Sequence, residues 1–169
     1  MEFRLSKINY YFDFVIYPII VLGLIFFENF NFSLFLAEIL IWTLFEYSMH
    51  RWIFHSPRFP YIRKMHMAHH SEPEATIGVS SLGTSLAYMT YASILFFIFG
   101  ESMFPFLTGF LAGYCWYIYY HAIGHHHIFK LGSHWVSHEA HHSFAATSNF
   151  GVTTDLWDRV FNSMKETHV

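Results

Sequence analysis

Long stretches without charged residues alternate with short polar segments along this chain. Four stretches are predominantly apolar, and they cover Tyr10–Phe27, Phe32–Met49, Leu82–Gly100 and Met103–Ile123. The last two contain no Asp, Glu, Lys or Arg, whereas Asp13, Glu38 and Glu46 interrupt the first two. About 20 apolar residues in a helix cross the hydrocarbon core of a bilayer. The pattern therefore predicts an all-α integral membrane protein with four transmembrane helices.

Very short links within each pair of stretches, Glu28–Asn31 and Glu101–Ser102, predict two helical hairpins that open to the same side of the membrane. That side receives the N-terminus, the segment Arg51–Ser81 and the chain from Gly124 onward. All nine basic residues fall there: Arg4, Lys7, Arg51, Arg58, Arg63, Lys64, Lys130, Arg159 and Lys165. By the positive-inside rule we expect this side, with both termini and a histidine-rich helical cap, to be cytoplasmic.

Composition narrows the class of protein further. The 169 residues are enough for a single domain, which we expect to span residues 1–169. Only 12% of the residues are charged, and the net charge of −3 argues against a nucleic-acid partner. The single cysteine, Cys115, excludes an intrachain disulfide and cysteine-based zinc or iron–sulfur sites.

Histidine is the unusual component of the sequence. Ten of the fourteen histidines form two similar sets of five, which are His50, His55, His66, His69 and His70, then His121, His125, His138, His141 and His142. Residues three and four apart share one face of a helix, so most members of each set point the same way if their segments are helical. His50 and His55 are five apart, and they face one metal only if the helix ends or breaks between them.

Ten imidazoles exceed the four to six ligands of one metal ion, so the sequence predicts two metal ions at the cytoplasmic face. A lone histidine is more often a core residue whose ring nitrogens have hydrogen-bond partners. Two matching sets of five histidines are not explained in that way. The remaining histidines, His126, His127, His134 and His168, fall outside the repeat. We expect the first three to be surface residues and His168 to belong to an unstructured tail.

The order His-x4-His, His-x2-His-His, His-x3-His, His-x2-His-His after paired apolar hairpins resembles the fatty acid hydroxylase/sterol desaturase superfamily of membrane diiron oxygenases. The segment 149–161, NFGVTTDLWDRVF, resembles the closing part of that family. The resemblance covers roughly Glu46 to Phe161. The family more often has proline where Asp155 stands, so we assign Asp155 no shared role.

The resemblance implies two iron ions, held by the ten histidines, that activate O2 and hydroxylate an unactivated C–H bond of a lipid. Zinc can take the place of iron in an isolated protein of this kind. A fatty acyl or sphingolipid chain is the expected substrate, with carotenoid or sterol hydroxylation or desaturation as the alternative. Two electrons must come from an external donor, which would be a cytochrome b5-like or ferredoxin-like carrier or a reductase.

Acidic and amide side chains near the histidines are candidates for orienting the imidazoles, because a ligating imidazole usually donates its other N–H to an oxygen. Glu46 lies four residues before His50, and Asp158 and Asn149 lie in the closing segment. The alternative role of Glu46 is a helix-surface pair, that of Asp158 is a helix cap, and that of Asn149 is a turn cap.

A membrane zinc protease is the rival from another class of enzyme. The run from His138 to His142 fits His-Glu-x-x-His, with Glu139 as general base. This hypothesis leaves seven histidines unexplained, which are His50, His55, His66, His69, His70, His121 and His125. A metal carrier or transporter is a third alternative, but it predicts histidines along a path across the bilayer and not at one face.

Overall fold

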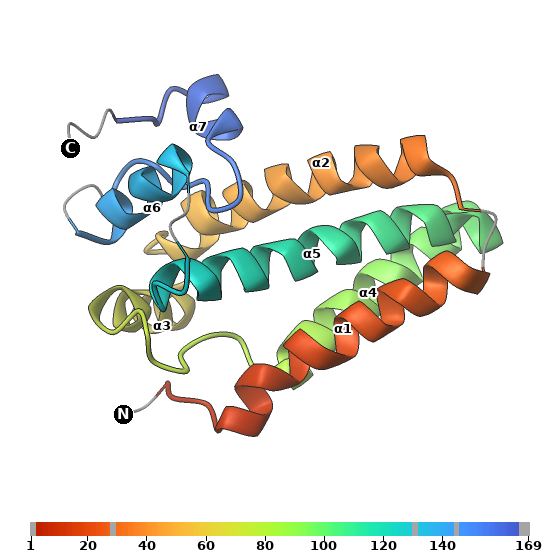
Figure 1. Ribbon diagram of the computed structural model, residues 1–169, viewed down its shortest axis with the longest axis horizontal. Helices are drawn as coiled ribbons and strands as arrows, with labels where there is room; N and C mark the ends of the chain where they lie inside the picture. The colour runs from red at the N-terminus through yellow and green to blue at the C-terminus, as the bar shows by residue number, and fades with distance from the viewer. Residues whose placement is uncertain (1–2, 28–29, 130–131, 144–145, 166–169) are drawn as a thin grey trace.

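The computed structural model describes residues 3–27, 30–129, 132–143 and 146–165, and this part of the chain is helical (Figure 1). In chain order the elements are α1 (Lys7–Phe27), α2 (Phe32–Met49), the π-helix η1 (His50–Phe54), α3 (Pro60–Ser71), α4 (Ser81–Phe99), the 3-10 helix η2 (Gly100–Met103), α5 (Phe104–His125), α6 (Ser133–Ser143) and α7 (Leu156–Val160). The described residues contain no strand, and one antiparallel bridge joins Arg4 to Ile77. The all-helical fold class is confirmed.

The four long helices α1, α2, α4 and α5 coincide with the four predicted apolar stretches to within a few residues. In Figure 1, α1 and α4 run toward the right-hand end, and α2 and α5 return from it. Helix α5 packs against both α2 and α1, and α4 packs against α1. The shorter helices α3, α6 and α7 gather at the left-hand end. The C-terminal ends of α2 and α5 therefore lie beside these three helices.

Glycines bring α2 and α5 close together. A Cβ atom on Gly113 would lie 2.4 Å from the Trp42 ring, and one on Gly109 would lie 2.5 Å from the Cβ of Glu38. Small residues four apart allow such close backbone approach between helices in membranes. Since α2 leads into His50 and α5 carries His121 and His125, this contact sets the position of three histidines relative to one another.

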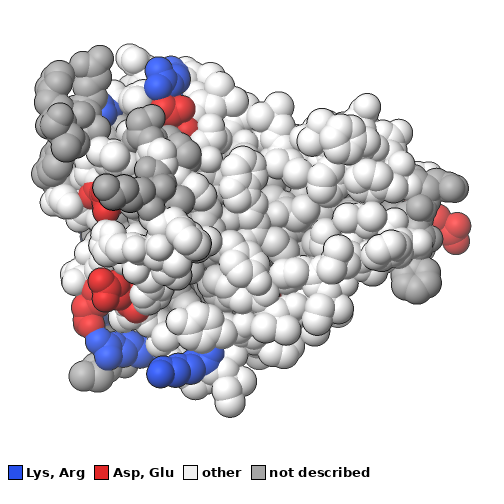
Figure 2. All heavy atoms as spheres, in the orientation of Figure 1, with Lys and Arg blue, Asp and Glu red and all other residues white. Residues whose placement is uncertain are grey.

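The surface of the helical bundle is suited to a bilayer. Three stretches are long and apolar enough to cross one, Lys7–Phe26, Phe32–Phe54 and Ser81–His125, and the third contains both α4 and α5. Large apolar side chains point outward, with Phe97 92% and Phe26 82% exposed. Figure 2 shows charged side chains at the two ends of the molecule and a long uncharged band between them. An apolar surface of this extent indicates a membrane protein.

Candidate metal centre

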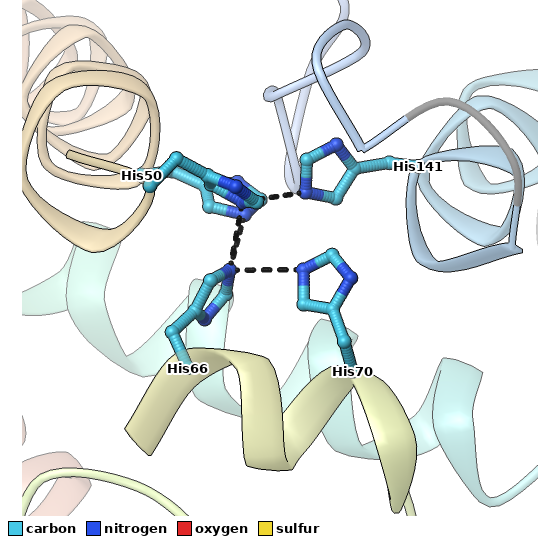
Figure 3. Close-up of side chains that lie close together, drawn as sticks. His50, His66, His70 and His141 are labelled. Atoms are coloured by element: carbon cyan, nitrogen blue, oxygen red, sulfur yellow. Dashed lines mark hydrogen bonds between the residues drawn. The ribbon is translucent and has the colours of Figure 1, made fainter. Parts of the chain in front are cut away.

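Five histidines from three segments form the first cluster, which consists of His50, His55, His66, His70 and His141. One nitrogen from each side chain lies within 4.8 Å of every other. Figure 3 shows His50, from the start of η1, facing His66 and His70 on α3, while His141 reaches in from α6. The imidazoles therefore converge on one point from opposite sides.

The nitrogen–nitrogen distances in the first cluster match a metal site better than a hydrogen-bond network. His66 Nε2 lies 2.9 Å from His50 Nε2, 3.0 Å from His55 Nε2 and 3.1 Å from His70 Nε2. A single ring nitrogen has either one proton or one lone pair, so it cannot hydrogen-bond three others. Nitrogens about 2.0–2.1 Å from a shared metal ion lie about 3 Å apart, and such an ion fits this donor set.

A second cluster lies beside the first and consists of His69, His121, His125 and His142. His121 Nε2 lies 3.2 Å from His69 Nε2 and 3.0 Å from His125 Nε2. Both ring nitrogens of His142 are buried without a hydrogen-bond partner. Buried polar atoms of this kind call for an explanation, and a bound metal ion supplies one for the nitrogen that faces the other three imidazoles.

The tenth predicted ligand, His138, lies at the edge of the second cluster. Its ring centroid is 4.7 Å from that of His142 and 5.3 Å from that of His121, but 5.8 Å from that of His50. The side chain is 1% exposed, and both ring nitrogens lack a hydrogen-bond partner. This burial makes His138 a further candidate ligand on the side of the second cluster.

The two clusters do not follow the two halves of the sequence. His66 and His70 are one helical turn apart on α3 and point into the first cluster, whereas His69, about 100° away around the helix, points into the second. On α6 the arrangement is reversed, because His142 points into the second cluster and His141 into the first. Each half of the chain thus contributes one histidine to the cluster dominated by the other half.

A π-helical turn allows His50 and His55 to face the same point. The segment His50–Phe54 is a π-helix, in which the hydrogen-bonded partners are five residues apart instead of four. The ring centroids of His50 and His55 are consequently 5.1 Å apart. This wide turn is the break in the helix that the spacing of these two histidines requires.

Backbone carbonyls fix the tautomers of two histidines in the first cluster. His50 Nδ1 donates to the carbonyl of Phe150 at 2.5 Å, and His141 Nδ1 donates to the carbonyl of Ser148 at 2.6 Å. A proton held at Nδ1 leaves the Nε2 lone pair free to bind a metal ion. Asn149, between the two carbonyls, has φ +57°, a left-handed conformation that asparagine tolerates better than most residues.

Two buried carboxylates hold the loop that carries these carbonyls, residues 148–153, which we call the clamp loop. Asp158 accepts from the backbone N–H groups of Phe150 at 2.9 Å and Gly151 at 2.7 Å. Glu46 accepts from Val152 N–H at 2.7 Å and from the Thr153 hydroxyl at 2.5 Å. The sequence predicts direct hydrogen bonds between these carboxylates and imidazoles. In the structure both carboxylates instead bind the clamp loop, and backbone carbonyls of that loop accept from the imidazoles.

Asn149 joins the clamp loop to the segment that follows α7. Its backbone N–H donates to the Ser163 carbonyl at 3.0 Å, and its side-chain oxygen accepts from Lys165 N–H at 2.7 Å. Gly151 is needed for a different reason, since a Cβ there would lie 2.0 Å from the Thr154 carbonyl oxygen. The backbone can reach Asp158 only where a side chain is absent.

Burial keeps the imidazoles of the cap neutral. Desolvation, with a contribution from the neighbouring His141, lowers the pKa of His55 and of His69 to about 4, and burial likewise lowers the pKa of His70 to about 3. The pKa values of His66, His138 and His142 are lowered for the same reason. Because a metal ligand must be unprotonated, these side chains are ready to bind at neutral pH.

The histidines outside the repeat stay away from both clusters where they are described. His126 and His127 are exposed. The side chain of His134 and all of His168 lie outside the described residues. Glu139 is 44% exposed and lies 3.9 Å from His127 Nδ1, on the outer side of α6. A general base for a protease would have to face the metal, so this geometry disfavours the protease hypothesis.

A cavity of about 210 Å³ adjoins both clusters. Histidines of the first cluster (His50 and His66), histidines of the second (His69 and His121) and His138 line it, together with aromatic and apolar side chains from α1, α2 and α5. An apolar ligand in this cavity would contact the histidines. Nothing in the sequence pattern marked its position, because its lining comes from segments far apart in the chain.

The model of the fatty acid hydroxylase family matches residues 35–163 of this chain. A dihydroceramide fatty acyl 2-hydroxylase of Arabidopsis thaliana is 27% identical over 143 residues, which are 75% of this chain and 58% of the relative. A fatty acid 2-hydroxylase of Macaca fascicularis is 31% identical over 152 residues, covering 78% of this chain and 39% of the relative. The chain thus spans about half the length of these relatives.

A solved structure has the same fold. Full-length scs7p, of which only the hydroxylase domain is visible, superposes with a TM-score of 0.78 at 23% sequence identity. The superposition covers 94% of this chain and 67% of the other. The arrangement of helices around the clusters is therefore shared with that hydroxylase domain.

Proposed function

Because this chain belongs to the fatty acid hydroxylase family, we propose that it hydroxylates an unactivated C–H bond in the acyl chain of a fatty acyl or sphingolipid substrate. The observation that carries this proposal is the pair of interleaved histidine clusters beside an apolar cavity. The curated relatives named above are acyl 2-hydroxylases, which supports the same class of reaction.

We assign the metal ligands as two groups. His50, His55, His66, His70 and His141 would hold one iron ion, and His69, His121, His125 and His142, with His138 beside them, would hold the other. When bound, the two ions supply the activation of O2, so that one oxygen atom enters the C–H bond and the other leaves as water with two external electrons and two protons. Zinc binds the same imidazoles but activates only water.

Residues of this chain would bind the ions, orient the imidazoles and hold the substrate. The neutral imidazoles offer lone pairs without first losing protons, and the clamp loop holds His50 and His141 in the metal-binding tautomer. Aromatic side chains such as Trp42, Phe45 and Tyr117 line the cavity and keep an acyl chain in contact with the histidines while excluding water.

Labelled oxygen tests this function. We expect the chain, produced in a host with a compatible electron donor under 18O2, to yield a lipid heavier by one oxygen atom that derives from the gas. Glu139→Gln should leave most of the product, because Glu139 points away from both clusters. Loss of the product from Glu139→Gln, with His50→Ala and His121→Ala still active, would overturn the proposal in favour of a hydrolase.

We propose that the single domain lies in the membrane with both termini and the clusters on the cytoplasmic side, because the basic residues gather at that end. In a background with Cys115 replaced by serine, a cysteine at the exposed position Glu74 should react with an impermeant reagent only from the cytoplasmic side. A cysteine at the exposed position Glu101, between α4 and α5, should react only from the other side. Labelling of position 74 from the far side would contradict this topology.

A further inference from the structure

A buried carboxylate on the α1 side of the cavity has an unused oxygen. Asp13 is 4% exposed and lines the cavity together with Thr84 and Tyr114. Its Oδ2 atom accepts from the Tyr114 hydroxyl at 2.6 Å and lies 2.7 Å from the Thr84 hydroxyl, which also donates to it. Its Oδ1 atom has no hydrogen-bond partner. A buried acceptor without a donor is costly, and the ligand of the cavity can supply the donor.

A buried donor without a partner lines the same cavity. Trp42 is 8% exposed, and its indole Nε1 has no hydrogen-bond acceptor. The Trp42 ring packs edge-on against Tyr114, with centroids 5.5 Å apart, and Tyr114 in turn binds Asp13. One unpaired donor and one unpaired acceptor thus lie on two side chains that both contact Tyr114 and line the cavity that the histidines also line.

We propose that Asp13 and Trp42 bind the polar end of the lipid substrate, with Asp13 Oδ1 accepting from an uncharged N–H or O–H group and Trp42 Nε1 donating to a carbonyl. An amide-linked acyl chain has both groups and satisfies both side chains. An ester has only the carbonyl. A free fatty acid brings a second carboxylate toward Asp13, which electrostatic repulsion disfavours in a buried site. This inference rests on the proposed function, since it concerns the lipid that the cavity would hold.

The hydroxyl groups of Tyr114 and Thr84 determine what Asp13→Asn would do. Both donate to Oδ2, and only an asparagine oxygen at that position keeps both hydrogen bonds without reversing them, so this orientation is favoured and the NH2 group turns toward the position of Oδ1. The acceptor that faces the ligand becomes a donor. The variant should therefore reject an N–H group and accept a carboxylate or ester oxygen, which reverses the order of preference without a change in side-chain size.

The test measures binding of three lipids with the same saturated chain to the purified chain in nanodiscs: an N-acyl sphinganine, a methyl ester and a free fatty acid. We expect the wild type to bind the amide about 10- to 100-fold more tightly than the ester, and the free acid most weakly, as for a hydrogen bond to a charged group. Asp13→Asn should weaken amide binding at least about 10-fold and strengthen binding of the free acid.

Glu38→Gln is the matched control. Glu38 is also a carboxylate that is 4% exposed on a long helix, but it binds Tyr91 and does not line the cavity, so this variant should keep the wild-type order. Trp42→Phe gives an independent reading, since it should weaken amide and ester binding alike. Equal binding of amide and free acid by the wild type, or an unchanged order in Asp13→Asn, would overturn the inference.

The labelled-oxygen assay keeps this inference separate from the proposed function. If the wild type shows the predicted order of binding but no lipid gains oxygen from 18O2, the proposed function fails and the recognition site stands. If a lipid gains oxygen but all three lipids bind equally, the recognition site fails and the function stands.

Discussion

Replacing His70 and His141 together by alanine should remove one of the two proposed metal ions and leave the other bound with wild-type affinity. The two residues are 71 positions apart, but both contribute to the first cluster. The second cluster keeps all of its imidazoles in this variant. Metal content measured after dialysis against a chelator should therefore fall from two ions per chain to one.

Replacing His69 and His70 together should give a different result, although these residues are neighbours in the sequence. One faces the second cluster and the other faces the first, so each cluster loses one ligand. No ion should then be held with wild-type affinity. Hydroxylation should fall at least about 100-fold in both double variants, because loss even of an outer partner of a ligand costs 10- to 100-fold in metal affinity or activity.

His126→Ala controls for the loss of an imidazole as such, because this exposed histidine lies outside both clusters. It should retain two ions and full activity. If the variant lacking His69 and His70 keeps one tightly bound ion while the variant lacking His70 and His141 keeps none, the clusters follow the halves of the sequence and the interleaved assignment is wrong.

Asp158→Asn should weaken metal binding at the first cluster about 10- to 100-fold, although Asp158 contacts no imidazole in the described structure. Its Oδ1 accepts from Phe150 N–H and the Ser163 hydroxyl, and its Oδ2 accepts from Gly151 N–H. An asparagine amide nitrogen must therefore face a donor in either orientation. The clamp loop should shift, and the carbonyls that orient His50 and His141 should shift with it.

Glu46→Gln is the matched comparison and should have a much smaller effect. The backbone N–H groups of Val152 and Thr153 both donate to Oε1 of Glu46, while Oε2 accepts only from the Thr153 hydroxyl. A hydroxyl can accept as well as donate, so glutamine can keep every hydrogen bond. We expect a change in metal affinity below about 3-fold, since a hydrogen bond that is kept costs little.

Metal titration with separate observation of the two clusters measures both effects. The second cluster should keep its affinity in both variants, because no carbonyl of the clamp loop binds a histidine of that cluster in the described residues. Equal losses at both clusters from Asp158→Asn would indicate general unfolding and not a shift of the clamp loop.

The long helices could be predicted because their signal is local. A bilayer helix needs a continuous apolar run, and α1, α2, α4 and α5 coincide with such runs. The candidate ligands could be named for the same reason, since His66, His69 and His70 or His138, His141 and His142 show helical spacing within a few residues. Each of these features depends on neighbours along the chain.

The grouping of the histidines could not be predicted, because it depends on how α3 and α6 face each other. Spacing places His69 and His70 on adjacent helix faces, but only packing determines that these faces look into different clusters. The same holds for Asp158 and Glu46, whose proximity to the histidines in sequence suggested direct contact. Their partners in the clamp loop are mainly backbone N–H groups, which every residue except proline has, so the sequence does not mark them. Only the glycine at position 151 indicates that the backbone there packs closely.

X-ray diffraction at the iron absorption edge, from crystals of the iron-loaded chain, tests the central claim most directly. We expect two anomalous peaks, one among the imidazoles of His50, His55, His66, His70 and His141 and the other among those of His69, His121, His125 and His142. A single peak, or one peak among the histidines of residues 50–70 and another among those of residues 121–142, would contradict the interleaved diiron site.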